Sequence, residues 1–66
     1  MAPKYPKIRV RLTGRDGNAF AILGRVRQAM VKAGLPKSEV EAFVDEAMAG
    51  TYDHLLQTCL KWVSVS

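Results

Sequence analysis

Apolar and polar residues alternate along residues 7–13 of the chain. Ile8, Val10 and Leu12 take every second position, and Thr13 or a basic residue takes each position between and beside them. Successive side chains of an extended strand point to opposite faces, so this two-residue period predicts a strand with one buried face.

A helical period follows over residues 19–33. Apolar residues recur there at spacings of four and three, which places them on one side of a helix. Arg25, Gln28 and Lys32 fall on the opposite, solvated side. Gly34 and Pro36 then predict the end of this helix. The predicted buried stripe consists of Ala19, Leu23, Val26, Met30 and Ala33.

Two further helices are predicted in the second half of the chain. Ser38 and Glu41 have the spacing of a capping box, which predicts a helix that begins at Ser38 and ends at Gly50. Thr51 or Asp53 is expected to open a third, short helix. The expected buried residues are Val40, Phe43, Val44, Ala47 and Met48 in the second helix and Tyr52, Leu55, Leu56 and Cys59 in the third.

Residues 61–66 alternate again and predict a second strand, so the order is strand, helix, helix, helix, strand. We expect an α+β fold: one domain over residues 7–66, in which a two-stranded sheet packs on three helices. Pro3 and Pro6 bar regular structure, so residues 1–6 are expected to be a flexible tail. The strand direction stays open. Pairing of strand edges across a dimer would extend the sheet to four strands.

The length and the cysteine count favour self-association. A chain of 66 residues buries only about 60 % of the surface that its unfolded form exposes, so its core is marginal. Cys59 is the single cysteine and His54 the single histidine, so neither an intramolecular disulfide nor a His/Cys zinc site can form. We therefore expect no metal, no cofactor and a homo-oligomer, with a dimer favoured.

One side of the first helix, outside its main stripe, is a candidate oligomer interface. It contains Phe20, Gly24 and Val31, with Arg27 among them. A glycine inside a helix costs roughly 1 kcal/mol relative to alanine, and the close approach of another helix or chain would explain it. Tight packing within the monomer is the alternative.

Nothing in the sequence indicates targeting or a membrane span. The first seven residues lack the apolar core of a signal peptide. The longest apolar run, residues 19–23, is far shorter than the roughly 20 residues that cross a bilayer. A lone thiol also fits a reducing compartment. We expect a cytoplasmic protein without a membrane partner.

Charge is distributed unevenly along the chain. Residues 1–37 carry nine Lys or Arg against one acid, and residues 38–66 carry one Lys against five acids, so +8 and −4 sum to the net charge of +4. A basic half favours an anionic partner. The alternative is that the basic first helix simply packs beside the acidic second helix.

The connection between the first strand and the first helix is the leading candidate site. A helix start presents unpaired backbone N–H groups, and glycines let a phosphate approach them. The connection lacks the pattern of a Walker loop or of G-x-G-x-x-G. A tight turn capped by Asp16 or Asn18 is the alternative. The predicted ligand-binding residues are Thr13, Gly14, Arg15, Gly17, Asn18 and Arg25.

The sheet face opposite the helices is a second candidate site. The strand alternation places Lys7, Arg9 and Arg11 on that face, and the second strand would place Trp62 beside them. Basic side chains around an aromatic ring suit single-stranded nucleic acid, because bases stack and phosphates pair. The alternatives are a contact of an arginine with Trp62 that shields the exposed sheet face, or a dimer interface.

Catalysis has little support in the sequence. His54 and Cys59 are five residues apart, so they do not share a helix face, and no serine has a histidine and an acid at recognisable positions. We expect His54 to meet Asp53, a helix cap or solvent, and Cys59 to be a small buried apolar residue. The prediction is a protein without catalytic residues that is not an enzyme.

Residues 8–24, 50–56 and 62–65, and above all the string G-x-D-G-N-A-F at residues 14–20, resemble short uncharacterised proteins of bacterial genomes, prophages and phages. The similarity covers nearly the whole chain. It implies an accessory protein of a mobile element that acts in the cytosol of a bacterial host. Small proteins of that kind often act stoichiometrically, by binding a host protein or by sequestering a small signal.

Three functions are therefore predicted in order. The first is binding of an anionic small molecule, such as a nucleotide or another phosphate-containing ligand, near residues 14–18. The second is a protein-interaction module that inhibits a host nucleic-acid or defence enzyme. The third is direct nucleic-acid binding through the basic strand face.

Overall fold

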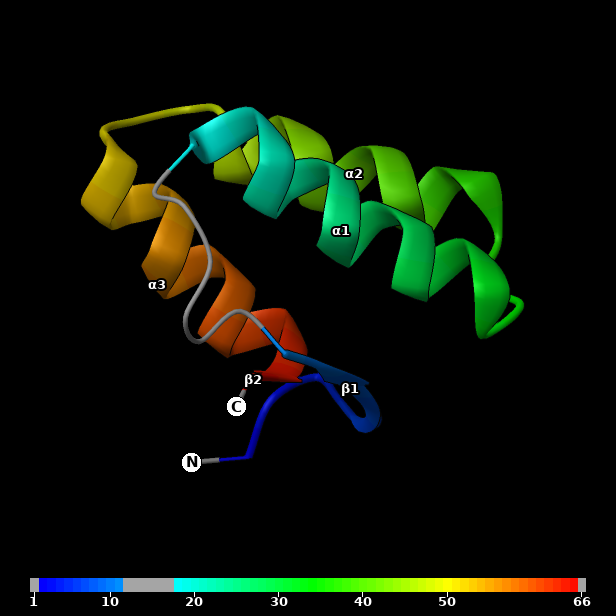
Figure 1. Ribbon diagram of the computed structural model, residues 1–66. Helices are drawn as coiled ribbons and strands as arrows, with labels where there is room; N and C mark the ends of the chain where they lie inside the picture. Colours follow the sequence, from blue (N-terminus) through cyan, green and yellow to red (C-terminus); the bar gives the residue numbers. More distant parts are fainter. Residues whose placement is uncertain (1, 12–17, 66) are drawn as a thin grey trace.

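The elements follow one another in the predicted order. The computed structural model describes residues 2–11 and 18–65, and it shows the α+β fold that the sequence predicts. The elements are β1 (Tyr5–Val10), α1 (Ala19–Lys32), α2 (Lys37–Ala47), α3 (Tyr52–Trp62) and β2 (Val63–Val65). In Figure 1, α1 and α2 lie side by side and antiparallel, α3 crosses at one end, and both strands lie on the side away from the α1–α2 pair.

The two strands form a parallel pair, with Arg9 opposite Ser64 and Val10 opposite Val65. Three helices separate the strands, and a long connection of this kind is what a parallel pair requires. The Ser64 hydroxyl donates to the carbonyl oxygen of Pro6 at 2.8 Å, which adds a side-chain bond to the ladder. The direction that the sequence left open is therefore parallel.

β1 begins earlier than the sequence predicts. It includes Tyr5 and Pro6, and the backbone N–H of Lys4 donates to the carbonyl of Lys61 at 2.9 Å. Pro6 is tolerated because β1 pairs only with β2 among the strands that the structure describes, and proline is accepted at such edge positions. Residues 4–6 thus belong to the folded domain. The last two residues of the predicted strand, 12 and 13, lie outside the described residues.

The core forms where one face of the sheet meets the helices. Ile8 and Val10 point inward, as the alternation predicts, and their outward neighbours are exposed. α1 contributes Ile22, Val26 and Met30. Ala33 was predicted to be buried but is exposed, because it is the C-cap of α1 and lies beyond the last helical turn. The remaining core residues are Val40, Phe43, Ala47, Leu55, Cys59, Trp62 and Val63.

The predicted capping box of α2 is wrong. α2 starts at Lys37 after Pro36, and no side chain caps it. Pro36, with an extended backbone, takes the N-cap position, and Ser38 is already the second residue of the helix, where its side chain is not placed to cap. At its far end Met48, predicted on the buried face, is 57 % exposed.

α3 begins as predicted and ends later. The Thr51 hydroxyl accepts from the backbone N–H of His54 at 3.3 Å, so Thr51 is the cap. The helix then continues through Trp62, which shortens β2 to three residues. None of the helices that the structure describes has the length and hydropathy needed to cross a membrane.

Candidate functional site

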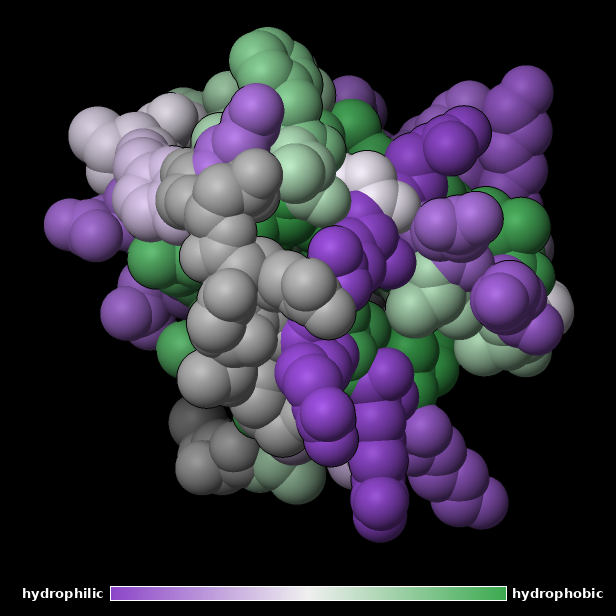
Figure 2. Space-filling view, viewed as in Figure 1, coloured by the Kyte–Doolittle hydropathy of each residue, from purple (hydrophilic) through white to green (hydrophobic). Residues whose placement is uncertain are grey.

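The outward face of β1 is basic, as the sequence predicts. Lys7, Arg9 and Arg11 are all exposed, because they alternate with the inward Ile8 and Val10. Arg9 and Arg11 border a shallow depression beside Ser64 and Val65. Figure 2 shows hydrophilic side chains gathered over the lower side of the molecule, where β1 lies in Figure 1.

Trp62 does not belong to this face, so the predicted aromatic platform is wrong. Trp62 is the last residue of α3, is 6 % exposed, and packs edge-on against Phe43 with ring centroids 5.8 Å apart. Its indole N–H donates to Glu46 at 3.2 Å. Lys4 Nζ lies 4.4 Å from the Trp62 ring centroid. The alternative, an arginine contact with Trp62 on the exposed sheet face, is wrong as well, because Trp62 is buried and the cation over its ring is Lys4.

The strand-to-helix connection cannot be assembled as a site from the described residues. Thr13, Gly14, Arg15 and Gly17 lie outside them. Asn18 caps α1: its side-chain oxygen accepts from the backbone N–H groups of Phe20 and Ala21 at 2.9 and 3.4 Å. Two of the N–H groups that an anion would need are thereby already bonded. Arg25 is exposed, about 10 Å further along the helix axis.

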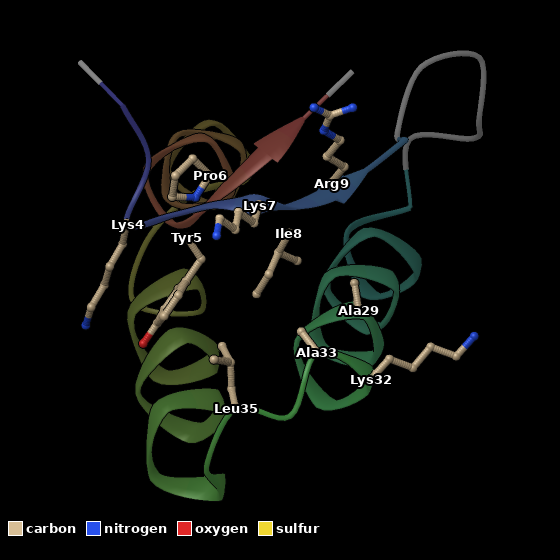
Figure 3. A pocket seen from close by; sticks show the side chains of 10 residues that line it. All are labelled: Lys4, Tyr5, Pro6, Lys7, Ile8, Arg9, Ala29, Lys32, Ala33 and Leu35. Carbon is tan, nitrogen blue, oxygen red and sulfur yellow. The ribbon is translucent and has the colours of Figure 1, made fainter.

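A groove with a volume of about 640 Å³ lies between β1 and the C-terminal part of α1. Figure 3 shows it opening below β1, with Ile8 and Tyr5 above and α1 at one side. Ala29 of α1 and Ala33, the C-cap that follows it, have side chains small enough to leave this space. We call it the β1 groove. Its lining residues are Lys4, Tyr5, Pro6, Lys7, Ile8, Arg9, Ala29, Lys32, Ala33 and Leu35.

One edge of β1 lies along this groove. Six consecutive residues, from Lys4 to Arg9, line it, which is the footprint of a strand edge rather than of one strand face. In Figure 3, β2 lies on the other side of β1 from the groove. Within residues 2–11 and 18–65, β2 is the only strand paired with β1. The groove therefore combines an apolar floor with an open strand edge.

The unpaired charges of the β1 groove are all positive. Lys7, Arg9 and Lys32 form no ion pair with any described residue. Lys4 is already engaged, since its Nζ lies 2.9 Å from Oε1 of Glu39 on α2. No acidic residue lines the groove among the described residues. Three cations thus remain for a ligand.

Glu39 organises one end of the groove. The Tyr5 hydroxyl donates a short hydrogen bond to Glu39, beside the Lys4 pair. These two bonds stabilise the carboxylate and lower the pKa of Glu39, the bond from Tyr5 contributing most. The same bond raises the pKa of Tyr5. The Tyr5 hydroxyl is therefore committed to Glu39, and its ring forms the wall of the groove.

The sequence points to only part of this groove. It singles out Lys7 and Arg9 by alternation, but it places Lys4, Tyr5 and Pro6 in a tail. For the α1 side of the groove, the sequence offers one local signal. Ala29 and Ala33 are four residues apart, and small residues at that spacing leave room beside a helix.

Neither of the two residues considered for catalysis is free to react: His54 is hydrogen-bonded and Cys59 is buried. His54 Nε2 lies 2.7 Å from the carbonyl oxygen of Glu46 and donates to it, a partner that the sequence did not indicate. Cys59 is a buried free thiol, as predicted, and burial raises its pKa to about 11. No cluster of three potential metal ligands exists among the residues that the structure describes.

The predicted interface residues of α1 lie on the surface. Phe20 is 75 % exposed and Val31 is 54 % exposed. A Cβ added at Gly24 would have nothing within 4 Å, so packing within the monomer, the alternative explanation for this glycine, is not what the structure shows.

Comparison with known proteins adds no relative from which a role could be transferred: no family model, curated protein or solved structure matches this chain significantly.

Proposed function

We propose that this chain is a non-enzymatic binding module that holds an acidic, extended polypeptide segment in the β1 groove. The observation that carries the proposal is the open edge of β1 beside an apolar floor, with Lys7, Arg9 and Lys32 as unpaired cations around it.

The open edge supplies affinity through the backbone. A strand edge presents N–H and C=O groups that an extended peptide can pair with, while pockets for alternate side chains give specificity. Pro6 removes one donor from the edge, and Lys7 adds charge. Such residues discourage indiscriminate strand pairing, so the edge rejects neutral or basic strands and accepts an acidic one.

A polypeptide fits the groove better than a nucleotide or a single nucleic-acid strand. Those ligands need an accessible aromatic ring or a cluster of free backbone N–H groups. Trp62 is buried, and Tyr5 is the single aromatic residue among the described residues that line the groove, which is too little for successive bases to stack on. The groove therefore supports the anionic partner of the first prediction and the protein partner of the second, at a different place from residues 14–18.

The proposal of a non-catalytic role rests on the states of Cys59 and His54, the two side chains considered for catalysis. The Cys59 thiol is buried and stays protonated near neutral pH, since its pKa is about 11. His54 donates to a backbone carbonyl. Neither side chain is presented to a ligand in the β1 groove. A stoichiometric binder is also the role that the resemblance to prophage proteins implies.

Fluorescence anisotropy with a labelled decapeptide of alternating glutamate and valine tests this function. We expect binding that weakens with added salt, because the cations of the groove are exposed. Replacing Lys7 and Lys32 together with glutamine is expected to raise the Kd about tenfold or more, since two charge-assisted contacts of some 1 kcal/mol each are lost. The peptide methylated on alternate backbone nitrogens is expected to bind far more weakly, because it cannot pair along the strand edge.

Two comparisons locate the site and identify the ligand class. Arg25→Gln removes one charge outside the groove. If this variant lost affinity and the variant at Lys7 and Lys32 did not, the site would lie near the start of α1 instead. An oligothymidine that binds more tightly than the acidic peptide would show that the basic face serves nucleic acid. Either result overturns the proposal.

A further inference from the structure

A second surface of the molecule, separate from the β1 groove, exposes apolar side chains along α1 and α2. Phe20, Val31 and Met48 are each more than half exposed. Figure 2 shows apolar surface at the end of the molecule where α1 begins in Figure 1. We call the surface formed by both helices the α1–α2 face. Its residues are Phe20, Gly24, Arg27 and Val31 of α1 with Lys37, Glu41, Val44 and Asp45 of α2, and Met48 after α2.

The residues of this face belong together because α1 and α2 are antiparallel. At one end a depression of about 210 Å³ brings Phe20 of α1 beside Met48. Further along, a second depression of about 550 Å³ is lined by Arg27 and Val31 of α1 and by Glu41 and Asp45 of α2. Gly24 lies between the two depressions. A Cβ added there would have no described atom outside its own helix within 4 Å, so the surface at Gly24 is open.

The charged residues of the face are Arg27 on α1 and Lys37, Glu41 and Asp45 on α2. Lys37 and Glu41 form an ion pair with each other at 3.8 Å. Arg27 and Asp45 form no ion pair with any residue in the described part of the chain. A partner that presented an acid to Arg27 and a base to Asp45 would match the face.

We propose that the partner is a second copy of this chain. A twofold axis parallel to the two helices places α1 of one copy over α2 of the other, so that basic meets acidic twice and Arg27 approaches Asp45 of the second copy. Such an isologous contact is self-complementary, and it forms a four-helix arrangement with the apolar residues at its centre. The proposal does not depend on what the β1 groove binds.

Size and charge favour this contact over pairing of two β1 edges. A standard interface covers about 800 Å² of each partner, roughly a sixth of the accessible surface of 4611 Å², which one face can supply. Pairing two β1 edges would instead bring Lys7 and Arg9 of each copy close to the same residues of the other, and like charges across a strand pair are unfavourable.

Sedimentation velocity of the full chain over a range of concentrations tests the dimer. We expect a dimer whose Kd rises tenfold or more in Arg27→Asp, because two copies of Asp45 then face an acid. Asp45→Arg alone is expected to weaken it similarly, and the two changes together are expected to restore it. Arg25→Asp makes the same charge change on another side of α1 and is expected to leave the Kd within about twofold.

The outcomes separate the possibilities. A chain that stays monomeric at millimolar concentration, or a dimer that ignores both single changes, overturns the proposal. If Arg27→Asp loses its helical circular dichroism, Phe20→Ser replaces it, since Phe20 is too exposed to hold the monomer together, and an unchanged dimer in that variant also overturns the proposal.

Discussion

Phe43 is the largest fully buried side chain among the described residues. It is fully buried on α2 and meets the edge of Trp62 from α3. Trp62 in turn lies 6.1 Å from the ring of Tyr5, measured between centroids. A chain of three aromatic rings thus links α2, α3 and β1. In a domain of this size, one such contact accounts for a large share of the net stability.

We predict that Phe43→Ala lowers the free energy of unfolding by about 3–5 kcal/mol, because it leaves a cavity beneath Trp62. Urea denaturation followed by tryptophan fluorescence measures this loss. Leu60→Ala is the matched control: Leu60 is apolar but 51 % exposed, so its loss is expected to stay within about 0.5 kcal/mol. Equal effects of the two changes would contradict the central place of Phe43.

At the scale of elements, the helix starts differ in how they are capped. Asn18 bonds two N–H groups of α1, and Thr51 bonds one of α3, whereas α2 has no side-chain cap. The start of α2 is instead followed by Glu39, whose carboxylate is occupied by Tyr5 and Lys4.

We predict that Asn18→Ala lowers the free energy of unfolding by about 1 kcal/mol, since the N–H groups of Phe20 and Ala21 lose their acceptor. Ser38→Ala, at the position where the capping box was expected, is predicted to change it by less than about 0.5 kcal/mol. Thermal unfolding followed by circular dichroism distinguishes the two. A larger loss of unfolding free energy in Ser38→Ala than in Asn18→Ala would show that Ser38 caps α2 after all.

Local pattern was enough to predict the element order and the inward residues Ile8 and Val10 of β1, and it narrowed each of the caps Asn18 and Thr51 to one of two residues. It failed where distant contacts decide. The alternation of residues 61–66 reads as a strand, yet burial of Trp62 against Phe43 extends α3 through it. The β1 groove was out of reach for the same reason: residues 4–9 and 29–35 are brought together only by the packing of α1 on β1.

At the scale of the whole molecule, two carboxylates of α2 bind the residues at the end of the sheet where both parallel strands begin. Glu39 binds Lys4 and Tyr5 at the start of β1. Glu46 binds Lys61 at 2.7 Å and the indole of Trp62, just before β2. The bond from Lys61 contributes most to lowering the pKa of Glu46, and the bond from Trp62 contributes next.

We predict that stability declines on acidification because of these two carboxylates. Their pKa values are lower in the folded chain than the ordinary value of 4.5, so the unfolded chain takes up protons first. The stability that they contribute is fully present above pH 4.5 and is lost as the pH falls through the lower folded values. Urea titrations at several pH values measure this. Glu39→Gln with Glu46→Gln is expected to flatten the profile, and an unchanged acid slope would contradict it.

The parallel pairing of β1 with β2 also sets an order of events during synthesis. Pro6 and Ser64, bonded across the pair, are 58 residues apart. At ribosomal rates of about 5 to 20 residues per second, β1 waits roughly 3 to 12 s for its neighbour. Throughout that interval β1 lacks β2, its partner in the sheet. The proline and the cations that line β1 therefore guard the nascent chain against aggregation before the fold closes.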